Sequence, residues 1–143
     1  MAKILWIDDD VYDIQFLLYS VEKNGIIIDK IHHLPEAYDL LKDNHQSYNL
    51  IVLDLLMPST NKSGETPPWL SEDAPRGANG AILLKLIREN LKIKLPVLIL
   101  SIMGPEAIED LEIHSEQLQP LQVIRKTPDN LGYLPTAIKE LLK

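Results

Sequence analysis

Short apolar runs alternate along the chain with stretches in which apolar residues recur every three or four positions. The apolar runs cover 3–7, 26–31, 48–53, 96–100 and 121–125. Runs of this length are typical of strands that are buried on both faces of a parallel sheet. The stretches between them have the spacing of amphipathic helices. We predict these helices at about 11–23, 35–42, 80–90 and 104–114, with a last helix that has Pro135 in its first turn.

Strands that alternate with helices predict an α/β fold, in which a parallel sheet lies between two layers of helices. A chain of 143 residues is long enough to bury such a core as one domain, and we expect that domain to span 1–143. The segment 59–79 interrupts the alternation, because its prolines and glycines break every apolar periodicity. It predicts a long loop inserted between the third strand and the next helix.

The composition of the chain favours some cellular compartments and some classes of binding partner over others. A formal net charge of −7 disfavours nucleic acid, which proteins bind largely through lysine and arginine. The chain has no cysteine, which suits a reducing compartment. The apolar stretch 4–7 is too short for a signal peptide or a membrane span. We therefore expect a cytoplasmic protein without a membrane contact, whose partner is a protein or a cation.

Polar and charged residues stand where four of the predicted strands end. They are Asp8 and Asp9 after the first strand, Asp54 after the third, Ser101 after the fourth and Lys126 after the fifth. Because the carboxyl ends of parallel strands meet at one edge of the sheet, we expect these side chains to lie close together. The tips of neighbouring strands lie about 5 Å apart, so Asp9 and Asp54 can share a cation if the first and third strands are neighbours.

A hard cation suits this set of side chains. Magnesium is usually held by one or two carboxylates together with water and phosphate oxygens. Lys126 carries a flexible positive charge that can reach the same place. Acids, a hydroxyl and an amine around a divalent ion favour phosphoryl transfer, in which a carboxylate can itself be the nucleophile. The plainer alternative is that Asp54 merely caps a loop.

This ordered set of motifs resembles the receiver domain of two-component response regulators, the CheY-like fold. The matching segments are 4–10, 50–58, 79–80, 97–101 and 124–126. The resemblance implies a five-stranded sheet in the order 2-1-3-4-5, with helices on both faces. It covers the whole chain except the inserted loop.

The resemblance also implies roles for the acidic residues. Asp54 corresponds to the phosphoacceptor of the family. Asp8 and Asp9 then hold a Mg²⁺ ion together with Asp54 and the backbone carbonyl of Leu56. A histidine kinase or a phosphotransfer protein is the implied phosphoryl donor.

Two further residues have implied roles around the phosphoryl group. Ser101 corresponds to the switch hydroxyl that follows this group, and Lys126 to the lysine that steadies it. In the family this lysine is followed directly by proline, often through a cis bond, whereas here Thr127 stands between Lys126 and Pro128. Either the cis bond moves to Thr127–Pro128, or Thr127 replaces the proline in a trans peptide.

Other departures concern the switch and the lifetime of the phosphorylated state. Ile102 stands where the family has a small residue, and it can narrow the approach to Asp54. Val123 replaces an aromatic residue that often rotates with the switch, so we expect no aromatic coupling. Leu56 and Met103 occupy positions where the family varies the rate of hydrolysis. Both are apolar, so we expect a long-lived phosphorylated form.

Two parts of the predicted surface each have two possible interpretations. The insertion is either a lid or docking element with Trp69 as its anchor, or a surface loop that simply tolerates length. Tyr12, Phe16 and Tyr19 form an aromatic stripe on the first predicted helix. This stripe either contacts the kinase or phosphotransfer protein or packs against neighbouring loops. The four histidines have no metal-ligand spacing, and we expect them at the surface.

Together these inferences predict a stand-alone receiver that accepts a phosphoryl group on Asp54 in a Mg²⁺-dependent phosphorelay and signals to an unknown protein target. Such a protein supports its own phosphorylation and slow dephosphorylation but is not a turnover enzyme. The alternative is a pseudo-receiver that binds proteins independently of phosphorylation, which Ile102, Val123 and Thr127 favour. A hydrolase of small phosphates is the third candidate. Leu56 argues against it, because it stands where a second acid would be needed.

Overall fold

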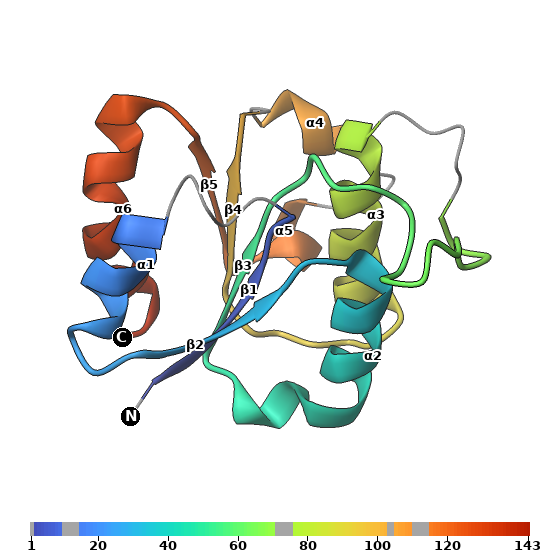
Figure 1. Ribbon diagram of the computed structural model, residues 1–143, viewed down its shortest axis with the longest axis horizontal. Helices are drawn as coiled ribbons and strands as arrows, with labels where there is room; N and C mark the ends of the chain where they lie inside the picture. The colour runs from blue at the N-terminus through green and yellow to red at the C-terminus, as the bar shows by residue number, and fades with distance from the viewer. Residues whose placement is uncertain (1, 10–14, 71–75, 103–104, 110–114) are drawn as a thin grey trace.

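Five parallel strands form the centre of the molecule (Figure 1). The computed structural model describes residues 2–9, 15–70, 76–102, 105–109 and 115–143. The strands are β1 (Lys3–Ile7), β2 (Ile27–Ile31), β3 (Leu50–Leu53), β4 (Val97–Ser101) and β5 (Leu121–Arg125). They lie in the order β2-β1-β3-β4-β5, and each neighbouring pair is parallel. The expected α/β class and strand order are confirmed.

Helices cover both faces of this sheet. They are α1 (Gln15–Glu22), α2 (Leu34–Asn44), the short 3₁₀ helix η2 (His45–Ser47), α3 (Arg76–Glu89), α4 (Glu106–Glu109), α5 (Ser115–Leu118) and α6 (Pro128–Leu141). Figure 1 shows α1 and α6 on one side of the sheet and α2 and α3 on the other, with α4 and α5 against α3. Of the helices that the structure describes, none is long and apolar enough to cross a membrane.

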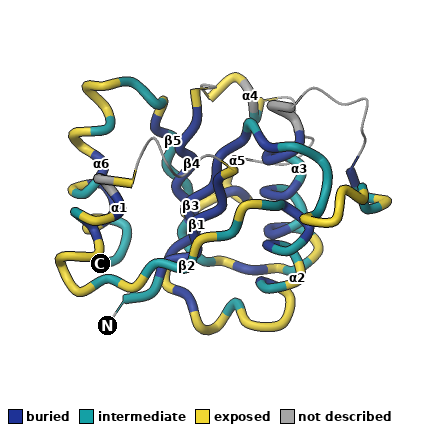
Figure 2. Tube along the Cα trace, in the orientation of Figure 1, coloured by how far each residue is buried: buried dark blue, intermediate teal, exposed yellow. Residues whose placement is uncertain are grey.

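The sheet separates two apolar cores, because successive side chains of a strand point to opposite faces. Toward α2 and α3, the three central strands contribute Leu5, Ile7, Ile51, Leu53, Val97 and Ile99. Toward α1 and α6, they contribute Ile4, Trp6, Leu50, Val52, Leu98 and Leu100. The edge strands β2 and β5 are only partly buried (Figure 2). The runs at the three central strands therefore mark strands that pack on both faces, whereas the runs at β2 and β5, which contain charged residues, do not.

The helix α3 begins one turn earlier than the sequence pattern predicts. The predicted loop extends to residue 79, but residues 76–79 belong to α3. Glycine and asparagine are poor helix formers, so local propensity does not indicate a helix here. A tertiary contact holds this turn, because the side-chain amide of Asn79 donates to the Met57 carbonyl oxygen at 2.9 Å.

The last helix begins at Pro128, and the prediction that Pro135 lies in its first turn is wrong. Thr127 is the N-cap of α6, and its side-chain oxygen accepts from the Asn130 N–H at 3.3 Å. Pro128 occupies the first turn, where backbone N–H groups have no partner within the helix, so its missing N–H costs no helical hydrogen bond. Pro135 lies inside the helix, where the complete burial of Leu134 against the sheet helps to hold the turn despite the proline.

Parts of two helical predictions lie outside the described residues. The helix predicted at 104–114 is described only at α4, and 110–114 lie outside. The aromatic stripe is described only at Tyr19, whose side chain is 69% exposed. Tyr12 and the side chain of Phe16 lie outside the described part of the chain, so the role of the stripe stays a prediction.

The described part of the insertion, 59–70, packs against α2. The ring centroids of Trp69 and Tyr38 are 5.2 Å apart, with the planes tilted by 38°. Leu70 is buried in the core on the same side of the sheet. Figure 1 shows this segment leaving the end of β3 and running past α2. The anchor of the insertion therefore lies on α2.

Candidate functional site

The register of β1 against β3 brings two acids side by side. Ile7 pairs with Leu53, so Asp8 and Asp54 are the next residues at the carboxyl edge of the sheet. The Asp54 N–H donates to the Ile7 carbonyl oxygen at 2.9 Å. This bond continues the ladder by one residue and keeps the two acids in register beyond the strands.

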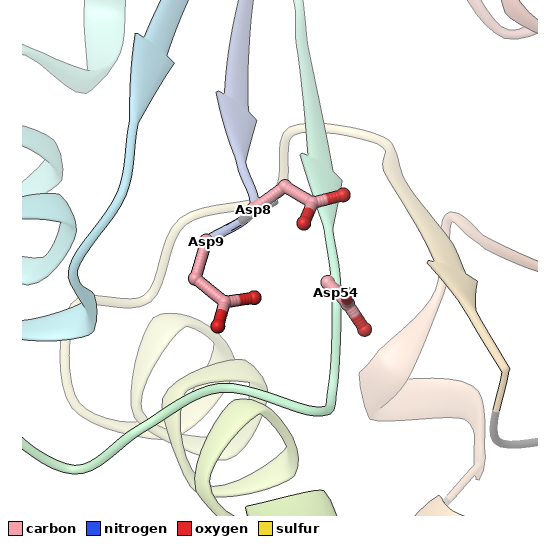
Figure 3. Close-up of side chains that lie close together, drawn as sticks. All are labelled: Asp8, Asp9 and Asp54. Carbon is pink, nitrogen blue, oxygen red and sulfur yellow. The ribbon is translucent and has the colours of Figure 1, made fainter. Parts of the chain in front are cut away.

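Asp8, Asp9 and Asp54 form a compact group that we call the acidic cluster (Figure 3). One carboxylate oxygen from each residue lies within 4.8 Å of the others. Asp8 and Asp54 are buried, with relative exposures of 1% and 6%, whereas Asp9 is exposed. Three carboxylates at this distance repel one another, so the cluster requires positive charge nearby.

Lys126 supplies part of that charge. Its Nζ donates to Asp8 Oδ2 at 2.9 Å and to Asp54 Oδ2 at 3.0 Å. Burial by itself lowers the pKa of Lys126, but attraction to Asp54 and Asp8 more than offsets this effect, and the pKa is raised. The amine therefore stays protonated at neutral pH. Among the described residues, this amine bridges the carboxylates of Asp8 and Asp54.

The donor atoms of the acidic cluster fit a hard divalent cation. All donors of the acidic cluster are carboxylate oxygens, which suit Mg²⁺ better than a soft metal. The exposure of Asp9 leaves room for the water ligands that Mg²⁺ usually keeps. The Leu56 N–H donates to Asp54 Oδ1 at 3.0 Å, so the backbone at Leu56 adjoins the cluster. The ligand role of its carbonyl stays a prediction.

The pairing of β4 with β5 brings Ser101 and Lys126 to the same edge. Ser101 pairs with Arg125 and is completely buried. Its carbonyl oxygen accepts from the Lys126 N–H at 2.7 Å, which holds the lysine backbone just beyond β5. The structure thus gathers the predicted site residues at one end of the sheet. The switch role of Ser101 stays a prediction.

A close backbone approach holds the loop that carries Asp54. A Cβ on Gly80 would lie 2.5 Å from Leu55 Cα and 2.6 Å from the Asp54 carbonyl oxygen, so a larger residue would push α3 away from this loop. The Gly80 N–H donates to the Leu55 carbonyl oxygen at 3.1 Å. Sequence analysis identified Asn79 and Gly80 only as a matching motif. The structure shows that both residues bind the chain directly after Asp54.

Comparison with known proteins gives matches among solved structures. No family model matches the chain, and no curated protein does. The receiver domain of Francisella response regulator 1452 has 26% sequence identity and a TM-score of 0.67, over 99% of this chain and 97% of that one. The response regulator TrrA of Thermotoga maritima, in complex with Mg²⁺-BeF, has 22% identity and a TM-score of 0.66, over 99% of both chains. This chain folds as a response regulator receiver domain.

A third solved structure has the same fold. A two-component response regulator of Clostridium difficile has 24% identity and a TM-score of 0.66, over 99% of this chain and 96% of that one. The chain reaches this fold although Thr127 separates Lys126 from Pro128 after β5. Among the described residues the only cis peptide bond is Gln119–Pro120. Thr127–Pro128 is therefore trans, and Lys126 still contacts Asp8 and Asp54.

Two apolar departures from the receiver pattern lie on the last two strands or next to them, Ile102 directly after β4 and Val123 in the middle of β5. The Ile102 side chain is 58% exposed. Val123 is partly buried and packs against the core on the side of α2 and α3. Met103 lies outside the described residues. The expected effects of these three residues on the approach to Asp54, on switching and on hydrolysis stay predictions.

Sequence analysis did not identify two side chains, those of Arg88 and His32, that bind backbone carbonyl groups. Arg88 on α3 is 5% exposed, and burial lowers its pKa to about 10, so it stays charged at neutral pH. Its guanidinium donates to the carbonyl oxygens of Leu118, Ile93, Leu95 and Pro120. The ring of His32 contacts the Asp8 carbonyl oxygen at 3.1 Å. Neither contact has a signal in the spacing of the sequence, because both are made to backbone groups.

Proposed function

We propose that this receiver domain accepts a phosphoryl group on Asp54, and that Asp8, Asp9, Asp54 and the Leu56 carbonyl hold Mg²⁺ during the transfer. The observation that carries the proposal is the Lys126 ammonium between the Asp8 and Asp54 carboxylates, with Asp9 completing the acidic cluster. The phosphoryl donor is a histidine kinase or a phosphotransfer protein. The phosphorylated domain signals through contacts with another protein.

The reaction exchanges one bond to phosphorus for another. A carboxylate oxygen of Asp54 bonds to the phosphorus while the P–N bond to the donor histidine breaks, and the imidazole leaves. The product is an acyl phosphate on Asp54. Bound Mg²⁺ supplies neutralisation of the phosphoryl charge. Lys126 Nζ, 3.0 Å from Asp54 Oδ2, neutralises part of the same charge, and the Ser101 hydroxyl contacts the transferred group.

Three further observations support this proposal. TrrA, which shares the fold, is in complex with Mg²⁺-BeF. The acidic cluster of this chain contains only oxygen donors, as a Mg²⁺ site requires. The near-complete burial of Asp54 strengthens the electrostatic interactions around the reacting carboxylate, because water is largely excluded.

Acetyl phosphate with Mg²⁺ tests the proposal directly. Mass spectrometry should find one phosphoryl group on the wild-type protein and locate it at Asp54. Asp54→Asn should abolish the adduct. Asp9→Asn should raise the Mg²⁺ concentration that phosphorylation requires. Asp43→Asn, at an exposed position of α2, should change neither the adduct nor this concentration. Beryllofluoride, an analogue of the phosphoryl group, should perturb the wild-type NMR spectrum in the presence of Mg²⁺.

The second candidate is a binding module of the same fold that works without phosphorylation. Ile102, which is exposed next to Ser101, and Val123 in place of an aromatic residue favour it. A wild-type protein that gains no phosphoryl group and shows no response to beryllofluoride would support this candidate against the first.

A further inference from the structure

A side chain at the end of the edge strand β2 binds the backbone of the acidic cluster. His32 directly follows β2, and its ring Nδ1 lies 3.1 Å from the carbonyl oxygen of Asp8. A carbonyl oxygen only accepts hydrogen bonds, so Nδ1 is the donor and carries the proton. This contact joins the exit of β2 to the exit of β1, where the acids stand.

The backbone N–H of Asp8 is also bound by the end of β2. The Asp8 N–H donates to the Ile31 carbonyl oxygen at 3.0 Å, one residue before His32. The peptide unit that joins Asp8 to Asp9 is planar. A bond to the Asp8 carbonyl therefore also sets the direction in which the chain continues into Asp9.

That direction matters most for Asp9. Asp8 and Asp54 are buried and share Lys126, so packing and charge hold their carboxylates. Asp9 is exposed, and burial does not fix its position. Figure 3 shows Asp9 on the segment that continues from β1, with its carboxylate facing Asp54. The orientation of the Asp8–Asp9 peptide therefore sets the direction from which the Asp9 carboxylate approaches the other two.

We propose that His32 is a positioning residue for metal binding. It holds the Asp8–Asp9 peptide in the orientation that brings the Asp9 carboxylate into the acidic cluster, and it acts through the Asp8 carbonyl. This inference rests on the proposed metal site. Groups that orient metal ligands from outside the ligand shell are commonly worth about tenfold or more in metal affinity.

Three variants separate positioning from general stability. His32→Ala removes the donor, whereas His32→Asn keeps an N–H donor close to the position of Nδ1. His45→Ala is the matched control, because the His45 ring Nδ1 makes the same kind of bond, 3.1 Å from the Leu41 carbonyl oxygen on α2. The probe is Mn²⁺, whose free ion is counted by EPR, with Mg²⁺ as the competitor.

His32→Ala should weaken the affinity for Mn²⁺ and Mg²⁺ about tenfold, and His32→Asn should restore it to within about threefold of wild type. His45→Ala should bind as wild type does. Urea unfolding should show that His32→Ala and His45→Ala are equally stable. In the absence of metal, the Asp9 amide resonance should shift in His32→Ala and return in His32→Asn.

Wild-type affinity in His32→Ala, or an equal loss in His45→Ala, would overturn the inference. A failure of His32→Asn to restore affinity and the Asp9 resonance would also count against it. A wild-type protein that binds no divalent ion overturns the proposed metal site. In that case, the Asp9 amide resonance in the absence of metal tests the contact between His32 and the backbone independently of metal binding.

Discussion

The Nζ of Lys126 lies 3.0 Å from Asp54 Oδ2, although 72 positions separate the two residues in the chain. The same amine contacts Asp8. The register of β1 with β3, of β3 with β4 and of β4 with β5 produces this three-way contact. A buried carboxylate that loses its cation is costly. We therefore expect the stability of the fold to depend on Lys126.

Lys126→Met should destabilise the protein when divalent cations are absent. The variant leaves Asp8 and Asp54 buried without the lysine charge, which lowers the free energy of unfolding by about 3 kcal/mol. Mg²⁺ should stabilise the variant more than the wild type, because the ion then supplies the missing charge. Urea unfolding with and without Mg²⁺ measures both effects. Equal stabilisation of the two proteins by Mg²⁺ would contradict the expectation.

The free energy of unfolding should depend on Lys126 at alkaline pH. Burial opposes the charged form, but Asp54 and Asp8 outweigh it and raise the pKa of Lys126 above its ordinary value of 10.5 in the folded state. The contribution of the lysine is fully present below the unfolded-state pKa and is lost as pH rises through the folded-state pKa. As the pH rises above this ordinary value, wild type should lose stability faster than Lys126→Met. Parallel pH profiles from urea unfolding would refute this.

Gly80→Ala should lower the free energy of unfolding by about 3 kcal/mol or more, because its Cβ would lie 2.5 Å from Leu55 Cα. It should also slow phosphorylation, since the displaced loop carries Asp54. The control is Gly132→Ala on α6, where a Cβ meets no atom within 4 Å. That substitution should be neutral or stabilise by up to about 1 kcal/mol. Similar effects of the two variants in thermal unfolding would argue against the close approach.

Trp69→Ala should detach the insertion from α2. The indole packs on Tyr38 and is only partly buried, so we expect a loss of about 2 kcal/mol, less than for a fully buried tryptophan. Tyr19→Ala is the control, because that residue is 69% exposed. This substitution should change the free energy of unfolding by less than about 0.5 kcal/mol. A change in the rate of phosphorylation of Trp69→Ala would favour the lid. An unchanged rate would favour a loop that only packs.

The acyl phosphate on Asp54 should be long-lived, because the apolar side chain of Leu56 cannot orient an attacking water. Leu56→Asn supplies a polar group two residues after Asp54 and should shorten the half-life about tenfold or more. Mass spectrometry after removal of acetyl phosphate measures both half-lives. A wild-type half-life of seconds would refute the expectation.

Several site residues could be predicted because each ends an apolar run. Asp8 and Asp54 directly follow buried strands, Ser101 ends a buried strand and Lys126 follows the edge strand β5. Parallel strands bring their carboxyl ends to one edge. The order of the strands came only from the resemblance of the motifs. The start of α6 was missed, although Thr127 is a good N-cap residue, because the apolar spacing becomes regular only further along the helix.

The sequence by itself determined the class of the fold and the residues that end each strand, because both depend on local periodicity. The tertiary structure decided how these pieces meet. His32 binds the Asp8 carbonyl, Asn79 binds the Met57 carbonyl and Gly80 lies against Leu55. These contacts join distant segments through backbone groups. Almost every residue carries the same backbone groups, so the partner of such a contact leaves no pattern in the sequence.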